Sequence, residues 1–314
     1  MKEKHHPKTF DCIGAGLCTL DRLLLLEKFP APNQKIRALQ SRACGGGPVA
    51  NAIYTLARLG WKTAFIGLVG DDIEGRIIRQ EFLQAGVNID NLKVQPGGRT
   101  PAAQIWVDAA DGSRTVALDD LGIGNLNFND LDLEILQSAK FLLLDGRDAD
   151  FRLAISNLVH QAGGKVVYDL GSIRSRTEEI LRSADIVIAS ETFARAFKLN
   201  LQLEGVIREI LSFGVETCVI TLGERGWIWG DSNSADLGSG EAYKIKALDT
   251  TGAGDAFHGA FIHGLLNGWT TGKCAEFAGA AAALTCTILG GRGAFSSEIE
   301  ILDFMNSQGR CGEF

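Results

Sequence analysis

Short apolar runs alternate along the chain with segments whose apolar residues recur at helical spacing. Runs of about four to eight apolar residues are typical of strands that are buried on both faces of a parallel sheet. The chain is therefore predicted to be an α/β protein, with a doubly wound, mostly parallel sheet flanked by helices. The predicted strands are residues 12–16, 63–69, 141–145, 165–170, 186–189 and 218–222.

Two stretches depart from this alternation, because strand-like periodicity continues in them without an intervening helix. They are residues 34–44 and 99–118, and Asp111-Gly112 marks a turn in the second. We interpret them as a small β-sheet lid, formed by strands within residues 18–44 and 97–120 and inserted in the core. An ordinary edge hairpin would give the same pattern. No repeat or linker is visible, so residues 1–314 are expected to form a single domain.

Composition narrows the possible functions. The 314 residues are 46% hydrophobic, enough for a full core, and the net charge of −7 disfavours nucleic acid as a partner. The apolar run at residues 23–26 is too short to span a bilayer, so we expect a soluble, cytoplasmic protein without a membrane partner. The seven cysteines include no CxxC pair, which favours reduced thiols and no zinc site.

The string DTTGAGD at residues 249–255 directly precedes an apolar segment with helical periodicity. Unpaired N–H groups at a helix N-terminus attract anions, so Gly252, Ala253 and Gly254 are suited to holding the oxygens of a phosphate. Asp255 beside them is a candidate general base that accepts the proton of an attacking hydroxyl. The same residues are also favoured at the start of an ordinary helix.

DTTGAGD resembles the C-terminal signature of the ribokinase (PfkB) family of carbohydrate kinases. Further resemblance lies in GGGPVANAIYTLARLG (residues 45–60), IGLVGDDIEGRII (66–78) and TLGERG (221–226), in the order expected of the family. The resemblance spans roughly residues 10–305. It implies a ribokinase-like fold and transfer of the γ-phosphate of MgATP to a hydroxyl of a small sugar.

The resemblance also implies a set of sugar-binding residues. Asp21, at the end of the N-terminal strand segment, matches an aspartate that binds sugar hydroxyls, and a solvated loop carboxylate is the alternative. Gly46, Gly47 and Asn51 match the family's Gly-Gly-x-x-x-Asn pattern, and the amide of Asn51 offers both a donor and an acceptor. Pro48 stands where ribokinases commonly have lysine, which makes ribose less favoured.

The segments DGSRTVALDD (residues 111–120) and FLLLDGRDAD (141–150) resemble ketohexokinases and sulfofructose kinase-like members. In the latter, an arginine matching Arg147 reads an anionic group on the sugar. Arg147 is equally suited to pairing with Asp145, Asp148 or a lid carboxylate such as Asp120. A neutral ketose such as fructose is therefore the expected substrate. Sulfofructose, 2-keto-3-deoxygluconate and a nucleoside are the alternatives.

The resemblance places the nucleotide near TLGERG, through Thr221, Gly223 and Gly226, and an adenine near Ala283 and Cys286. Magnesium is expected with ATP, but Ser190 and Phe193 replace the family's Asn-x-x-Glu, and Glu191 is a possible substitute. Relatives also bind a monovalent cation such as K⁺, through backbone groups that correspond to Asp249, Thr251 and residues 290–296.

Other functional classes stay open. Gly14-Ala15-Gly16 follows the first strand, but Thr19 stands where a dinucleotide-binding turn needs its third glycine. A non-catalytic sugar sensor would not need the intact DTTGAGD string. Relatives often pair through their lids, so a homodimer through the lid is also expected.

Overall fold

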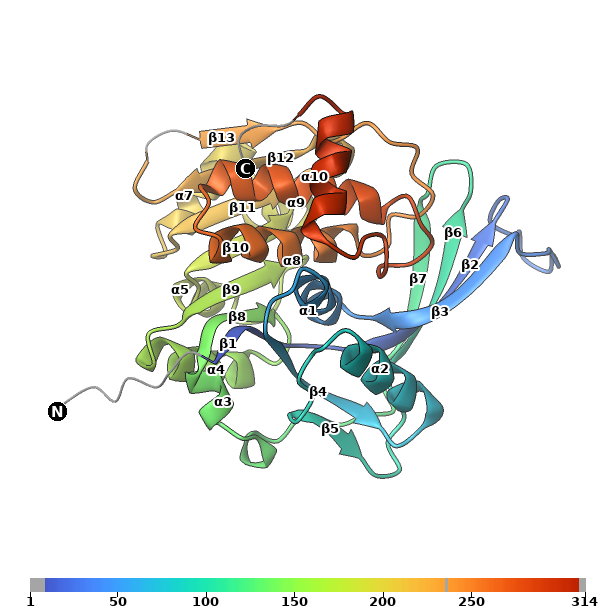
Figure 1. Ribbon diagram of the computed structural model, residues 1–314, viewed down its shortest axis with the longest axis horizontal. Helices are drawn as coiled ribbons and strands as arrows, with labels where there is room; N and C mark the ends of the chain where they lie inside the picture. Colours follow the sequence, from blue (N-terminus) through green and yellow to red (C-terminus); the bar gives the residue numbers. More distant parts are fainter. Residues whose placement is uncertain (1–8, 235–236, 311–314) are drawn as a thin grey trace.

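The computed structural model describes residues 9–234 and 237–310, which form a large and a small β-sheet (Figure 1). The large sheet has nine strands in the order β13-β12-β11-β10-β9-β8-β1-β4-β5. Every neighbouring pair from β5 to β11 is parallel, and β12 and β13 extend one edge in antiparallel pairing. The strands are β1 (Phe10–Ala15), β4 (Thr63–Gly70), β5 (Leu92–Gln95), β8 (Ala139–Asp145), β9 (Lys165–Leu170), β10 (Ile186–Ser190), β11 (Thr217–Thr221), β12 (Trp227–Asp231) and β13 (Leu237–Gly240).

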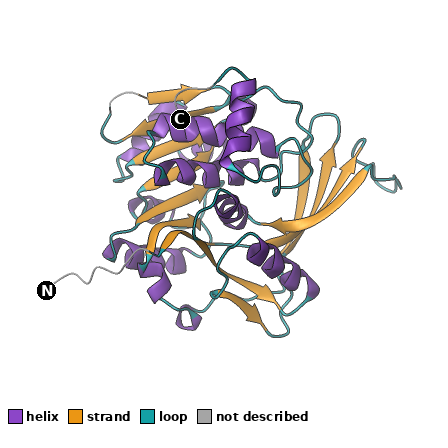
Figure 2. Cartoon of the chain, viewed as in Figure 1, coloured by secondary structure: helices purple, strands orange, loops and turns teal. Residues whose placement is uncertain are grey.

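Both faces of this sheet are covered by helices, as Figure 2 shows. Successive strand residues point to opposite faces, so Cys12 packs into one core and Ile13 into the other. The first core contains α1 (Pro48–Arg58), α2 (Ile73–Gln84), α8 (Ala253–Leu266), α9 (Thr271–Thr285) and α10 (Glu298–Ser307). The second contains α3 (Glu134–Gln137), α4 (Ala149–Gln161), α5 (Thr177–Arg182), α6 (Glu191–Phe197) and α7 (Leu203–Leu211). The predicted doubly wound, mostly parallel α/β fold is confirmed, and each predicted strand matches an observed one to within two residues at either end.

The small sheet extends away from the helices (Figures 1 and 2). Its strand order is β3-β2-β6-β7, in which β2 and β6 are parallel and the outer pairs are antiparallel. Leu23, Ile105 and Val107 from one of its faces form a separate apolar cluster with Leu289. The strands are β2 (Thr19–Leu26), β3 (Gln40–Gly46), β6 (Ala102–Asp108) and β7 (Arg114–Asp119).

One boundary of the predicted lid strands was wrong. The strand expected from residue 34 begins only at Gln40, where its ladder with β2 starts; Leu39 donates its N–H to the carbonyl of Leu25 but is 60% exposed. The predicted turn at Asp111-Gly112 is confirmed and forms part of the connection between β6 and β7, across which Asp108 donates its N–H to the carbonyl of Ser113. Gly112 adopts a positive φ of 71° within this turn.

Within residues 9–234 and 237–310, no helix has both the length and the apolar character needed to cross a bilayer. The six cysteines of this part of the chain are buried free thiols.

Candidate active site

The anion loop, Gly252–Gly254, lies where α8 begins. Gly252 has a φ of 78°, a left-handed conformation that favours glycine, and Ala253 is the first helical residue. The space beside Gly254 is open, since no heavy atom lies within 4 Å of the position that a Cβ would occupy. The N–H of Ala253 makes a long bond of 3.4 Å to the carbonyl of Thr250, and the positive end of the α8 dipole adjoins space that a ligand can enter.

The carboxylate of Asp249 anchors this loop. It is completely buried, and it accepts hydrogen bonds from the N–H of Thr251 at 2.8 Å and of Gly290 at 2.7 Å. These bonds tie the anion loop to the segment between α9 and α10. Leu248 adds a third tie, because its N–H donates to the carbonyl of Cys286 at the end of α9.

Asp255, in the first turn of α8, is bound by Asn51 of α1. The Nδ2 atom of Asn51 donates to Oδ2 of Asp255 over 2.8 Å, although the residues are 204 positions apart in sequence. Burial raises the pKa of Asp255 to about 6, and the negative charge of Asp169 acts in the same direction. The hydrogen bond from Asn51 opposes this rise. A carboxylate with such a pKa is suited to accept a proton near neutral pH.

Asp21, Gly46 and Gly47 lie together where the small sheet joins α1. A Cβ on Gly46 would come within 2.1 Å of Oδ2 of Asp21, so the buried carboxylate occupies the space that a side chain would need. Gly47 precedes α1 with a φ of 97°. Its carbonyl accepts the N–H of Asn51 at 2.9 Å, which connects these glycines to the residue that holds Asp255. Burial also raises the pKa of Asp21.

A cleft opens at the carboxyl ends of β8 and β9, where ligands bind in doubly wound sheets. Arg147 lines it and pairs with Asp120 at the end of the small sheet, with 3.2 Å between NH1 and Oδ2. Asp145 instead pairs with the buried Arg152 at 3.1 Å. Of the partners considered for the Arg147 side chain, the lid carboxylate is the one observed. The cleft is lined by Pro48, Asp145, Gly146, Arg147, Asp169, Gly171, Ser172 and Arg174.

Comparison with known proteins identifies the family. Residues 11–297 match the model of the pfkB family of carbohydrate kinases. The chain belongs to this family. It is 26% identical to a ribokinase from Haemophilus influenzae, over 95% of this chain and 98% of that protein, and 23% identical to a ketohexokinase from Mus musculus, over 88% and 95%. A ribokinase structure from Thermotoga maritima superimposes with a TM-score of 0.82 at 25% identity, covering 95% of this chain and 99% of that one.

These similarities confirm the expected family and ribokinase-like fold. The protein is a pfkB-family phosphotransferase, a kinase of sugars or nucleosides, and its relatives include both kinds. The first relatives are ribokinases, so the comparisons do not single out a ketose.

The residues expected on the nucleotide side of this pfkB kinase lie at the carboxyl ends of β10 and β11. Ser190 caps α6, since its hydroxyl accepts the N–H of Phe193 at 3.1 Å and donates to the carbonyl of Gly171 at 3.0 Å. Thr221 donates to the carbonyl of Ala189 at 3.3 Å. Gly223, with a φ of 62° at the start of the 3₁₀ turn η2 (Gly223–Arg225), faces open space.

Gly226 packs closely against the end of β13. A Cβ there would come within 1.9 Å of the carbonyl oxygen of Gly240, and its φ is 90°. The glycine at position 226 is thus explained by its contact with the end of β13.

Ala283 and Cys286, expected near an adenine, are 8% and 9% exposed at the end of α9.

The residues expected to bind magnesium and those expected to bind a monovalent cation differ in how well they are placed to do so. Glu191, the possible substitute for a magnesium-organising glutamate, is paired with both Arg195 and Arg225, so its carboxylate is not available as a free ligand. In residues 9–234 and 237–310, no group of three acidic, histidine or cysteine side chains is arranged to hold a metal. For a monovalent cation, the carboxylate of Asp249 is occupied by N–H groups, whereas the buried Oγ1 of Thr251 has no hydrogen-bond partner within the described part of the chain.

Several charged residues that the sequence analysis missed surround Asp255. His258, one helical turn later, directs Nδ1 to the carbonyl of Gly254 at 2.6 Å and Nε2 to Asp169 at 3.4 Å. Arg114 of β7 donates to Oγ1 of Thr250 at 2.6 Å. The i, i+3 spacing from Asp255 is a signal that places His258 on the same helix face. No spacing in the sequence indicates Arg114, because the fold alone brings β7 beside Thr250.

Proposed function

We propose that this chain transfers the γ-phosphate of MgATP to a hydroxyl of a small sugar. The observation that carries the proposal is the hydrogen bond between Asn51 and Asp255 beside the anion loop Gly252–Gly254. Asp255 accepts the proton of the sugar hydroxyl, whose oxygen attacks the γ-phosphorus in line as the bond to the bridging oxygen breaks and ADP leaves. The N–H groups of the loop stabilise the negative charge that develops on the transferred phosphoryl group.

Magnesium bound with ATP would neutralise part of the negative charge of the phosphates. Because Glu191 is engaged by two arginines, the protein contributes little to this metal, and ATP and water supply most of its ligands. A monovalent cation such as K⁺ beside Thr251 would provide a partner for its buried hydroxyl oxygen. Asp249 contributes by shaping the loop, since both of its carboxylate oxygens accept N–H groups.

Our preferred substrate is a neutral ketose such as fructose, held by Asp21, Gly46, Gly47 and Asn51. Two observations support a polar, uncharged ligand here. The buried carboxylate of Asp21 and the amide of Asn51 offer hydrogen bonds to hydroxyls. The charge of Arg147 is already countered by Asp120.

An anionic sugar such as sulfofructose or 2-keto-3-deoxygluconate is the second candidate. Arg174 lines the same cleft as Arg147, and two arginines in one cleft favour a phosphate, sulfonate or carboxylate. Arg147 is only about one-third exposed, and an incoming anion would have to displace Asp120 from it. A nucleoside is a further possibility, because the relatives include a nucleoside kinase.

The small sheet is suited to act as a lid that excludes water during transfer. It carries Asp21 at one end, and its turn at Gly112 contacts Thr250 of the DTTGAGD string. Val116 and Leu118 on its edge strand are 51% and 42% exposed, although they pair with Ile105 and Ala103 on the apolar face. This exposed apolar edge favours a homodimer through the lids, which sedimentation or light scattering would detect.

The test is a coupled ATP-turnover assay with MgATP and K⁺ across fructose, other ketoses, ribose, 2-keto-3-deoxygluconate, sulfofructose and nucleosides. Preference for a neutral ketose, retained in an Arg147→Ala variant, supports our proposal. Preference for an anionic sugar that Arg147→Ala abolishes would establish the second candidate. Absence of turnover with all of them would contradict a kinase of these substrates. Repeating the best reaction with Na⁺ in place of K⁺ tests the cation.

A further inference from the structure

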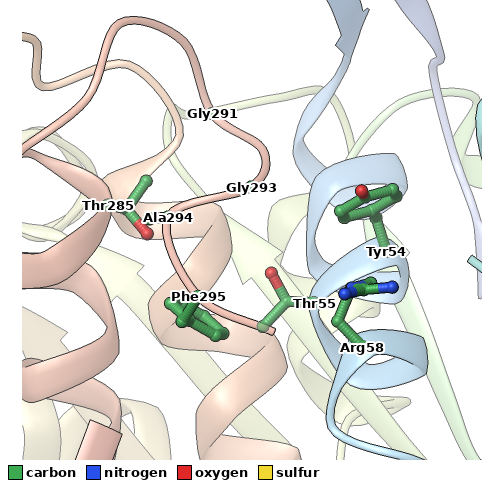
Figure 3. Close-up of a pocket in the computed structure, with 8 residues that line it drawn as sticks. All are labelled: Tyr54, Thr55, Arg58, Thr285, Gly291, Gly293, Ala294 and Phe295. Carbon is green, nitrogen blue, oxygen red and sulfur yellow. The ribbon is translucent and has the colours of Figure 1, made fainter. Parts of the chain in front are cut away.

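Arg292, in the segment between α9 and α10, is a buried charged residue behind the proposed sugar site. Only 3% of it is exposed. Its Nε donates to Oδ1 of Asn51 at 2.8 Å, and its NH1 donates to Oε2 of Glu81 at 2.8 Å. The guanidinium carbon lies 4.9 Å from the ring centre of Tyr54 and 5.0 Å from that of Phe82. Figure 3 shows Gly291 and Gly293, the neighbours of Arg292, beside the helix that carries Tyr54.

Arg292 is held in this position by its contacts with Arg42, Gly45 and Glu81. Arg42 of β3 donates to the carbonyl of Leu289 at 2.6 Å and to that of Arg292 itself at 2.7 Å. A Cβ on Gly45 would lie 2.1 Å from NH1 of Arg292, so the guanidinium packs directly against backbone that a side chain would displace. Glu81 joins the two, because Oε2 also accepts the N–H of Gly45 at 2.9 Å.

Stability alone does not account for this arrangement. The remaining nitrogen of the guanidinium, NH2, is buried without a hydrogen-bond partner among the described residues. A buried donor without a partner destabilises the folded state, because it has lost its hydrogen bonds to water and gained none in the protein. Buried ion pairs are also often no more stabilising than apolar residues of similar volume. The placement of Arg292 therefore calls for a role beyond holding the fold together.

The contact with Asn51 supplies that role. An asparagine amide has an acceptor end and a donor end, whereas a guanidinium has donors only. Because Arg292 can only donate, Oδ1 of Asn51 faces Arg292, and Nδ2 faces Asp255. In the reversed orientation, the amide oxygen would face the carboxylate of Asp255 and repel it.

We propose that Arg292 is a positioning residue for phosphoryl transfer: it orients the amide of Asn51 toward the general base Asp255, and Glu81 holds the guanidinium in place. This inference rests on the proposed function. Arg292 acts through Asn51 and does not itself contact the reacting atoms.

The positioning of Asn51 by Arg292 should affect the pH dependence of turnover. A hydrogen bond donated to a carboxylate favours its ionised form, so loss of the bond from Asn51 raises the pKa of Asp255. The other charged groups that act on Asp255 are Asp169 of β9, His258 of α8 and Arg114 of β7, and none of them contacts Arg292. The acidic limb of the kcat profile should therefore move to higher pH when Arg292 is replaced.

The experiment compares Arg292→Met, Glu81→Gln, the double variant and Arg292→Lys, with thermal unfolding, kcat and KM measured for each across pH. Arg292→Met is expected to lower kcat about tenfold or more, change the KM for ATP little, and move the acidic limb upward. The double variant also removes the partly buried carboxylate of Glu81 that Arg292→Met leaves without its cation, so its melting temperature should recover toward that of the wild type while kcat stays low. Arg292→Lys keeps the charge without the planar fork and should restore only part of kcat.

Two further variants make the result specific. Asn51→Ala should give the same shift of the acidic limb, and adding Arg292→Met to it should have little extra effect. Arg182→Met is the matched control, because Arg182 also packs on an aromatic ring, that of Phe213, and pairs with Glu178, away from Asn51. Recovery of kcat together with melting temperature in the double variant, or an unmoved acidic limb in Arg292→Met, would overturn the positioning role alone. Lack of turnover in the wild type would overturn the proposed function, and this inference with it.

Discussion

The α-carbon of Gly291 lies 2.4 Å from the position that a Cβ on Gly252 would occupy. The anion loop and the segment that carries Arg292 therefore meet backbone against backbone, with no room for a methyl group. Since Gly252 also has a φ of 78°, an L-residue there would be strained regardless of space.

Gly252→Ala and Gly254→Ala should consequently differ. Gly252→Ala is expected to lower the melting temperature by several degrees and to abolish turnover, because the loop has to move. Gly254→Ala meets no atom within 4 Å and lies within a helix, so its melting temperature should stay near that of the wild type. Its methyl group would project into the open space beside the loop, which should raise the KM for ATP. Equal melting temperatures for both variants would contradict this account of the loop.

Asp255→Asn removes the proposed general base while preserving the volume of the side chain. Turnover should fall by about 10²–10⁴-fold or more, as expected when a proton-accepting group is lost. The melting temperature should not fall, because a partly buried carboxylate whose charge is disfavoured by Asp169 is replaced by a neutral amide. Shifts of the melting temperature caused by sugar and by ADP should persist. Turnover within about a factor of three of the wild type would exclude Asp255 as the base.

The pH dependence of the wild-type enzyme follows from the raised pKa of Asp255, about 6. The ionised form accepts the proton, so kcat should fall as the pH drops through about 6, by about tenfold per unit well below it. Asp169→Asn removes the neighbouring negative charge and should move this limb to lower pH, opposite to the shift expected for Arg292→Met. A limb that stays in place in Asp169→Asn would mean that another group controls it.

The extent to which the sequence predicted this molecule differs between fold and site. Strands that are buried on both faces of a parallel sheet are continuous apolar runs in the sequence. The predicted strand 165–170 has the same bounds as β9. Residues 34–39 were misassigned because their periodicity resembles a strand, yet the ladder with β2 begins only at Gln40, and Leu39 just before it donates its N–H to the carbonyl of Leu25.

In the site, Asp255 and Asn51 were found because they belong to short strings that resemble family signatures. Arg292 and Arg114 were not, because each reaches its partner across more than a hundred residues of sequence. Local patterns carry no information on which distant side chains share a site. The pairing of Arg147 with Asp120 was among the alternatives, but only the fold selects it.

The contact between the small sheet and the anion loop gives the last prediction. Oγ1 of Thr250 donates to the carbonyl of Gly112 at 3.1 Å and accepts from Arg114 at 2.6 Å, so one hydroxyl links the turn and the edge strand of the lid to the DTTGAGD string. Thr250→Val keeps the shape of the side chain and removes both bonds, while the N–H of Thr250 still donates to Gly112 at 3.2 Å. We expect the KM for sugar to rise several-fold and the ratio of ATP hydrolysis to phosphoryl transfer to increase, because a looser lid admits water. Thr115→Val, at an exposed position of β7, is the matched control and should change neither quantity. If Thr250→Val hydrolyses ATP in the absence of sugar no faster than the wild type and keeps its KM, the contact does not hold the lid closed.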